Sequence, residues 1–118
     1  MREELVEAVL RVVEEIPEGR VATYGMIARA VGTGPRVVGR IMHDWGGGVP
    51  WWRVVSVHGT FPTTVRGEGF FEWEQEGIPH DPTRGRALIK ECVVEQEWLD
   101  GVALSVIEKL QDGAEMSD

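Results

Sequence analysis

The residues that could do chemistry in this sequence are sparse, and most lie in its middle third. Tyr24 and Arg36 each stand near the expected start of a short helix, and PWWRVV, at residues 50–55, places two tryptophans side by side. Helix N-termini offer free backbone N–H groups and a positive dipole end, which suit phosphates. Gly39 follows Arg36 by three residues, where a missing side chain would let another backbone approach closely. This pattern is consistent with phosphate contact. The alternative is that the two helices only pack together and that Arg36 is a solvated charge.

Covalent and metal chemistry find little support. Cys92 is the single cysteine, so an internal disulfide and a cysteine metal cluster are excluded, and the histidines are scattered without metal-ligand spacing. We expect Cys92 to be a buried apolar residue. We expect His43 and His58 to lie at the surface and Trp45 and Trp73 in the core. The sequence therefore predicts no metal site and no cofactor.

The first half of the chain predicts three helices. Apolar residues recur at helical spacing from Leu5 to Ile16, and a Pro–Glu–Gly break follows. Thr23 is a credible N-cap for a helix over 24–31. Pro35 suits the first position of a helix over 35–45. Two short helices joined by a glycine-containing turn are typical of a helix-turn-helix.

The second half predicts a small β element between helices. Residues 51–57 are strand-like, and a turn at 58–59 leads to a loop or second hairpin arm over 60–67. FFEWEQE indicates a helix that ends at Gly77, and residues 78–85 are expected to form a loop.

Apolar spacing from Trp98 to Leu110 indicates an acidic terminal helix that frays over 112–118. The predicted fold is mostly α with a small β wing. We expect one winged helix-turn-helix domain over residues 1–80, with 81–118 as an extension that packs on it.

Net charge is unevenly spread along the chain. The total is −8, yet residues 19–60 carry five arginines against one aspartate, whereas 1–18 carry two arginines against six glutamates. A local field steers a polyanion to a surface, so the middle segment could meet phosphate; an ordinary mixed surface is the alternative. No apolar run is long enough to span a membrane, and the start lacks a signal-peptide layout. We therefore expect a cytoplasmic protein, associated with the nucleoid if it is bacterial.

Three ordered motifs carry a family resemblance. IPEGRVATYGMIARAVG, RVVGRIM and PWWRVV together resemble the DNA-binding domain of the O6-alkylguanine-DNA alkyltransferases, in the same order and near the same spacing. The resemblance runs from about Val6 to about Gly77. It implies that Arg36 enters the duplex through the minor groove in place of an extruded base, and that Tyr24 crowds the backbone phosphate. It also implies that Gly39 meets the minor groove.

The resemblance assigns further site residues. It implies DNA contacts on the helix that begins at Pro35, Arg40 included, and a lesion pocket walled by Met42, with Val54 near it. We also assign Arg53 to this site, as an orienting charge. The segment from Thr60 to Gly67 would close over the flipped base.

The reactive residues of the resembling family are replaced in this chain. Its PCHRV motif holds a cysteine that takes the alkyl group and a histidine that helps remove its proton, whereas Trp51 and Trp52 stand at those positions here. Indole offers neither a comparable nucleophile nor a base. Glu76 matches the carboxylate that orients the histidine, and we expect it to have nothing to orient. We expect Trp51 to face the lesion and Trp52 to be structural.

This pattern resembles the alkyltransferase-like proteins, whose commoner form is PWHRV. The resemblance implies a monomeric, non-enzymatic sensor that binds O6-alkylguanine in double-stranded DNA by base flipping and presents it to nucleotide excision repair proteins. Two alternatives stay open at this point. One is a winged-helix transcriptional regulator, and the other is a protein-interaction module that has lost DNA binding.

Overall fold

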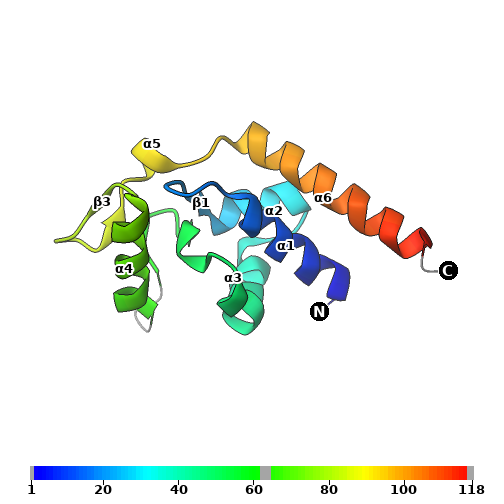
Figure 1. Cartoon of the computed structure of the whole chain (residues 1–118), viewed down its shortest axis with the longest axis horizontal. Coiled ribbons are helices and arrows are strands. Elements are labelled where there is room, and N and C mark those ends of the chain that lie inside the picture. Colours follow the sequence, from blue (N-terminus) through cyan, green and yellow to red (C-terminus); the bar gives the residue numbers. More distant parts are fainter. Residues whose placement is uncertain (1, 62–64, 117–118) are drawn as a thin grey trace.

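The computed structural model describes residues 2–61 and 65–116. Helices dominate the described chain, and two small two-stranded sheets accompany them, so the predicted fold class is confirmed. The molecule is elongated, with extents of 52 × 27 × 24 Å. The wing and one helix lie at one end, and the long C-terminal helix extends toward the other (Figure 1).

The N-terminal half folds as the sequence predicts. Its helices are α1 (Glu3–Glu15), α2 (Tyr24–Val31) and α3 (Pro35–Trp45). The Oγ1 atom of Thr23 accepts a hydrogen bond of 3.1 Å from the Met26 N–H, so the predicted N-cap is confirmed. Gly32 ends α2 with a φ of 83°, in the left-handed region that favours glycine. Pro35 occupies the first turn of α3, where its missing N–H costs nothing.

The segment predicted as a strand over 51–57 is mostly not a strand. Short 3-10 helices η1 (Gly46–Gly48) and η2 (Trp51–Arg53) precede β2 (Val54–Val55). The Arg53 N–H donates to the Pro50 carbonyl at 3.1 Å, which closes the η2 turn. β2 pairs in parallel with β1 (Ala22–Thr23). Trp52 and Arg53 of this turn make tertiary contacts, described below, that local spacing does not predict.

The wing lies later in the chain than predicted. The antiparallel pair consists of β3 (His80–Asp81), which lies within the segment expected to be a loop, and β4 (Arg86–Ala87), which follows it directly. The helix α4 (Arg66–Glu76) begins earlier than expected, and Gly77 ends it with a φ of 68°. Within the predicted loop over 60–67, residues 62–64 lie outside the described part.

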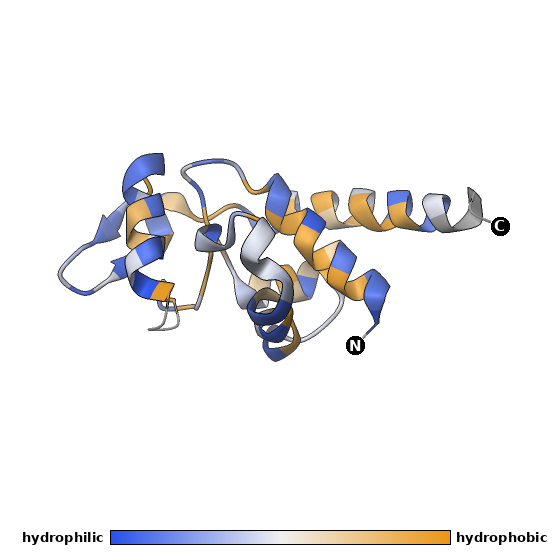
Figure 2. Cartoon of the chain, turned by 60° about the horizontal axis from the view of Figure 1, so that its bottom comes forward, coloured by the Kyte–Doolittle hydropathy of each residue, from blue (hydrophilic) through white to orange (hydrophobic). Residues whose placement is uncertain are grey.

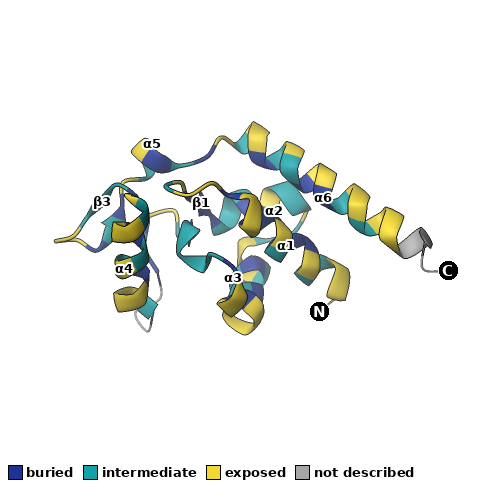
Figure 3. Cartoon of the chain, in the orientation of Figure 1, coloured by how far each residue is buried: buried dark blue, intermediate teal, exposed yellow. Residues whose placement is uncertain are grey.

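The C-terminal segment comprises α5 (Ile89–Cys92) and α6 (Gln96–Met116). α6 continues through residues 112–116, which the sequence predicted to fray. It packs on α1 and α2 through buried residues that include Leu99 and Ala103. Apolar residues recur along both α1 and α6 (Figure 2), while α6 is largely exposed over residues 107–113 (Figure 3).

Two hydrophobic clusters meet at the β1–β2 pair. The first joins α1, α2, α3 and α6, and the second lies under α4 and the wing. Val54 belongs to the first cluster and Val55 to the second, because successive strand residues face opposite sides. Trp73 and Cys92 are buried in the second cluster, as predicted. Trp45 is not a core residue: it is 48% exposed at the last position of α3, where the chain turns into Gly46.

Candidate nucleic-acid interface

Helices α2 and α3 present the predicted phosphate-binding residues. Tyr24 is the first residue of α2, and burial raises the pKa of its hydroxyl, which therefore stays protonated and able to donate. Arg36 is exposed at the second position of α3. Gly34, the N-cap of α3, has no side chain to cap the helix, and its carbonyl accepts from the Val37 N–H at 3.1 Å. Because Pro35 has no N–H, the first turn of α3 offers the Arg36 N–H to an acceptor.

A cavity of about 310 Å³ opens between α3 and the start of α4. Its volume lies near the lower end of the range of roughly 300–1,000 Å³ for small-molecule sites, which is adequate for a compact planar group. Apolar and aromatic side chains provide much of the wall, and glycines keep part of it open. The lining residues are Tyr24, Gly39, Met42, His43, Gly46, Gly47, Trp51, Phe61, Val65 and Glu68.

Trp51 is an aromatic wall of this cavity, and its ring stands between two others. Its centroid lies 5.7 Å from that of Trp52 and 5.8 Å from that of Phe61, both in edge-to-face geometry. Edge-to-face pairs are favoured by the ring quadrupoles. Gly69 has no side chain at a point where a Cβ would collide with the Phe61 ring, so this glycine allows Phe61 to reach the cavity.

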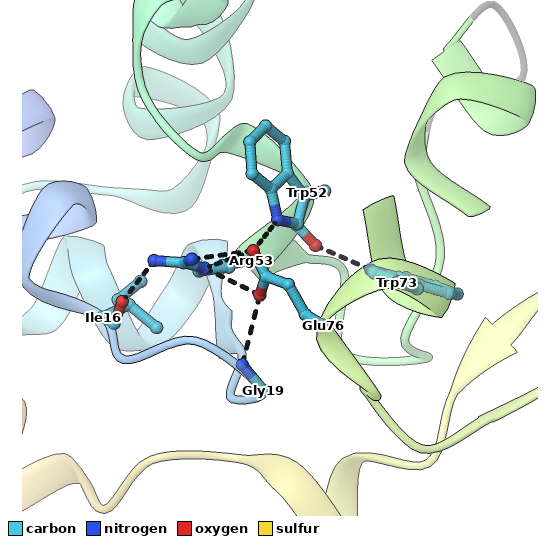
Figure 4. A network of polar contacts seen from close by, with 6 residues as sticks. All are labelled: Ile16, Gly19, Trp52, Arg53, Trp73 and Glu76. Atoms are coloured by element: carbon cyan, nitrogen blue, oxygen red, sulfur yellow. Dashed lines mark hydrogen bonds and ion pairs between the residues drawn. The ribbon is translucent and has the colours of Figure 1, made fainter. Parts of the chain in front are cut away.

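Behind the cavity, Glu76 organises a network of buried hydrogen bonds (Figure 4). Its carboxylate accepts from the Trp52 indole N–H at 2.6 Å and from the Gly19 backbone N–H at 3.1 Å. Arg53 donates to it through Nε at 2.9 Å and Nη2 at 2.7 Å, and through Nη1 to the Ile16 carbonyl at 2.8 Å. The expectation that Glu76 has nothing to orient is therefore wrong, because an indole N–H can donate where the family's histidine would stand.

The chemistry of this network holds Glu76 ionised. Burial opposes the charged form, but the hydrogen bonds from Arg53, Trp52 and Gly19 and the charge of Arg53 outweigh it, so the pKa of Glu76 lies below its ordinary value. The Trp52 carbonyl accepts a further bond of 2.7 Å from the indole N–H of Trp73. Trp52 is thus held from two sides, in agreement with its predicted structural role.

The structure brings some of the predicted site residues to the cavity. Tyr24, Gly39, Met42 and Trp51 line it. Pro35, Arg36 and Arg40 lie on the exposed surface of α3 instead, with Arg40 4.0 Å from Asp44. That surface borders the cavity through Gly39, which belongs to the same helix.

Other residues assigned to the pocket lie elsewhere. Val54 is 1% exposed and faces the hydrophobic core, because its β-bridge to Ala22 turns it inward. Arg53 is engaged by Glu76 behind the cavity. Thr60 closes a turn with Ser56, their hydroxyl oxygens 2.8 Å apart, and Gly67 belongs to α4 rather than to a loop.

Sequence reasoning missed part of the cavity wall. Phe61 and Val65 come from the flanks of the predicted loop, and His43 and Glu68 add titratable groups. Phe61 could have been noticed in the sequence, because it is the one aromatic residue in a segment, residues 59–67, that is rich in glycine and threonine.

Within residues 2–61 and 65–116, no group of three or more histidine, cysteine, aspartate or glutamate side chains is placed to hold a metal ion. No helix in this part of the chain is long and apolar enough to cross a membrane. His43 and His58 are exposed, as predicted.

Comparison with known proteins gives concordant matches. Residues 4–76 match the family described as 6-O-methylguanine DNA methyltransferase, DNA binding domain. The DNA base-flipping proteins of Escherichia coli (strain K12) and Shigella flexneri are each 40% identical to this chain over 62 residues, or 49% of this chain and 48% of theirs. The chain therefore spans about half the length of these curated relatives in the match.

Solved structures of a yeast protein show the same fold. Schizosaccharomyces pombe Atl1 in complex with damaged DNA containing O6-carboxymethylguanine superimposes with a TM-score of 0.70 at 32% identity, over 80% of this chain and 99% of that one. A second complex of the S. pombe protein with DNA gives a TM-score of 0.69. The chain belongs to the family of the 6-O-methylguanine DNA methyltransferase DNA-binding domain, and within that family it is an alkyltransferase-like protein.

Proposed function

We propose that this protein recognises O6-alkylguanine in double-stranded DNA by rotating the altered nucleotide into the cavity walled by Trp51, without removing the alkyl group. The observation that carries the proposal is the position of Trp51 in the cavity wall. The resemblance of PWWRVV to PCHRV supports it, because that resemblance puts Trp51 at the position of the alkyltransferases' cysteine. The relatives support it, since they are named for base flipping and for a complex with damaged DNA. An O6 substituent cannot be probed fully inside the base stack, so extrusion is the chemically sensible route.

Three features of the cavity favour an extruded base over a water-soluble metabolite. Tyr24 lines it with a protonated hydroxyl able to donate to a backbone phosphate. Arg36 is exposed on the adjoining helix and long enough to occupy the space a rotated base leaves. Flat rings at Trp51 and Phe61 suit a base and its alkyl group.

The absence of alkyl transfer follows from the side chains that are present. Trp51 carries no nucleophilic atom comparable to a thiolate. Cys92 lies in the cluster under the wing, 1% exposed, and its Sγ donates to the Leu88 carbonyl. Burial raises the pKa of this thiol, which keeps it protonated. We therefore propose a binding protein rather than an enzyme, acting as a monomer in the cytoplasm.

The titration of matched DNA duplexes tests the proposal. One duplex carries a single O6-methylguanine and its twin carries guanine, and fluorescence anisotropy gives both affinities at one stated salt concentration. We expect clear preference for the lesion. Arg36→Ala should weaken lesion binding by about tenfold or more, whereas Arg11→Ala, which removes the same charge from α1, should have little effect.

Two outcomes would contradict the proposal. Equal, weak binding to both duplexes would remove the sensor function. A gain of the alkyl mass by the protein after incubation with the alkylated duplex would contradict the non-enzymatic part.

We further propose that the protein presents the bound lesion to nucleotide excision repair, on the strength of the resemblance. We also propose, from the order of the elements, a division into a domain over residues 1–80 and an extension over 81–118.

A further inference from the structure

A groove opens at the end of the molecule that carries both chain termini. It has a volume of about 500 Å³ and lies between the first turns of α1, the end of α2 and the distal part of α6. This end lies away from α4 and the wing (Figure 1). We refer to the space as the terminal groove, lined by Arg2, Glu4, Leu5, Ala8, Val31, Ile107, Leu110 and Gln111.

The floor of the terminal groove is apolar and only partly covered. Four of its side chains pack against the main hydrophobic cluster yet stay half-buried, namely Leu5, Val31, Ile107 and Leu110. The cluster does not close over them, because α6 runs past the start of α1 toward the C-terminus (Figure 1). The described chain therefore leaves this apolar surface open to a partner.

Carboxylates stand around the terminal groove. They belong to exposed residues on the first turn of α1 and the distal turns of α6, namely Glu3, Glu4, Glu108 and Asp112. Within residues 2–61 and 65–116, none of these carboxylates belongs to an ion pair. The basic residues on the same turns are Arg2 and Lys109, so the surroundings of the groove are net negative.

The C-terminal end of α6 adds to this negative potential. A helix carries the negative end of its dipole at the C-terminus, where the last carbonyls lack partners within the helix. Basic residues often compensate this charge, but the last turn of α6 contains none. A cationic side chain beside the groove would therefore meet both the carboxylates and the helix end.

We propose that the terminal groove binds a basic amphipathic helix of a partner protein. Apolar side chains at helical spacing would enter the groove, and lysines or arginines beside them would face the carboxylates. A second copy of this chain is disfavoured, because a two-fold contact would bring equal carboxylates together. DNA and an anionic membrane are disfavoured by the same charge.

This inference goes beyond the proposed function and does not depend on it. The terminal groove shares no lining residue with the lesion cavity, so a partner bound at the groove would leave the cavity open.

The probe for the test is a fluorescein-labelled leucine–lysine peptide whose leucines recur at helical spacing. Its twin has glutamate in place of every lysine. Anisotropy is measured with the full chain and without DNA, since a cationic peptide would bind the duplex itself. We expect the lysine peptide to bind, with an affinity that falls as the salt concentration rises, and the glutamate peptide not to bind.

Charge reversal at the groove should weaken this binding. Glu4→Lys combined with Asp112→Lys should lower the affinity by about fivefold or more. Glu14→Lys combined with Glu15→Lys is the matched control, because it makes the same charge change on exposed residues of α1 that do not line the groove. The control should lower the affinity by less than about twofold. Ile107→Ala, which removes part of the apolar floor, should weaken binding in the same direction as the groove pair.

The position of the bound peptide is checked by nuclear magnetic resonance. Changes in backbone amide shifts should concentrate at the groove, for example at Leu5, Val31 and Leu110. Equal losses in the two charge-reversed pairs, or equal binding of the glutamate peptide, would overturn the proposal, because general attraction or apolar contact would then explain the binding.

Two other occupants would also be revealed. A dimer seen in sedimentation and dissociated by Ile107→Ala would assign the groove to a second copy. Binding to phosphatidylglycerol vesicles that Ile107→Ala abolishes would assign it to a membrane. Either result would overturn the proposal, and neither would bear on lesion recognition.

Discussion

At the scale of single residues, the two adjacent tryptophans of the 3-10 turn η2 have different surroundings. Trp51 faces the cavity, and Trp52 turns to the carboxylate of Glu76. Glu76 has a side chain only 5% exposed, and it is satisfied by an arginine, an indole and a backbone N–H. Such a carboxylate is costly to leave without partners. Trp52 thus belongs to the hydrogen-bonded support behind the cavity.

Stability should depend on the ionisation of Glu76. Its pKa in the folded protein is lower than the ordinary value of 4.5, so its contribution is fully present above that pH and is lost as pH falls through the lower folded value. The free energy of unfolding, measured in urea from pH 7 to pH 3, should therefore fall more for the native protein than for Glu76→Gln. Glu76→Ala should lower the free energy of unfolding at pH 7 by up to about 3 kcal/mol, since it leaves the Arg53 side chain, which is only 15% exposed, without its partner.

The control for this prediction is Glu15→Gln, at an exposed position of α1. It should follow the native pH profile. Parallel profiles for Glu76→Gln and the native protein would show that the network contributes nothing that depends on the charge of Glu76.

At the scale of elements, α3 serves two surfaces at once. Its Val38 and Ile41 are buried against the other helices, while Gly39 faces the cavity and Arg36 faces solvent. A Cβ at Gly39 would meet nothing within 4 Å in the protein itself. Glycine lowers the stability of a helix interior, and no packing contact within the protein requires a glycine at this position.

Gly39→Ala should raise the stability of the protein and lower its affinity for DNA. The free energy of unfolding should rise by about 0.5–1 kcal/mol because alanine restricts the unfolded chain and favours the helix. Affinity for the O6-methylguanine duplex should fall, since the added methyl group stands where the DNA backbone or the base would approach. Urea unfolding and anisotropy on the same preparations measure both.

Gly101→Ala on α6 is the matched control, because that glycine is also helical and also faces open space. It should give a similar stabilisation with unchanged DNA affinity. An unchanged affinity for Gly39→Ala as well would remove Gly39 from the interface.

At the scale of the whole molecule, the tertiary structure reduces the positive charge that the sequence assigns to the DNA-binding region. Arg53 is neutralised inside the protein by Glu76, and Arg40 lies near Asp44. Of the five arginines in residues 19–60, four stay exposed and can meet phosphates, and acidic segments flank this region on both sides. Binding must then depend more on the cavity than on general attraction to DNA.

The dependence of DNA affinity on salt concentration measures how much phosphate contacts contribute to binding. The slope of log K against log salt concentration should be shallow, roughly −2 to −3, for two or three phosphate contacts. Arg40→Ala should weaken binding to lesion and guanine duplexes by similar factors and make the slope shallower by about 1. A slope steeper than about −5 would mean that the protein holds DNA mainly through phosphates.

Local sequence patterns determined the elements whose formation depends on near neighbours. Helical spacing predicted α1 and α6, Thr23 and Pro35 marked the starts of α2 and α3, and Gly77 marked the end of α4. The tryptophan at position 51 also predicted the absence of thiolate chemistry at that position without any structure. These inferences succeed because capping, helix periodicity and side-chain nucleophilicity are properties of a residue and its immediate surroundings.

Only the tertiary structure decided the features that depend on residues far apart in the chain. The η2 turn forms so that Trp52 and Arg53 reach Glu76, 24 and 23 positions away, and Gly19 joins them from 57 positions away. The location of the wing, the exposure of Trp45 and the entry of Phe61 into the cavity likewise follow from packing between elements. Local spacing carries no information about such contacts, because their free energy is gained only when distant segments meet.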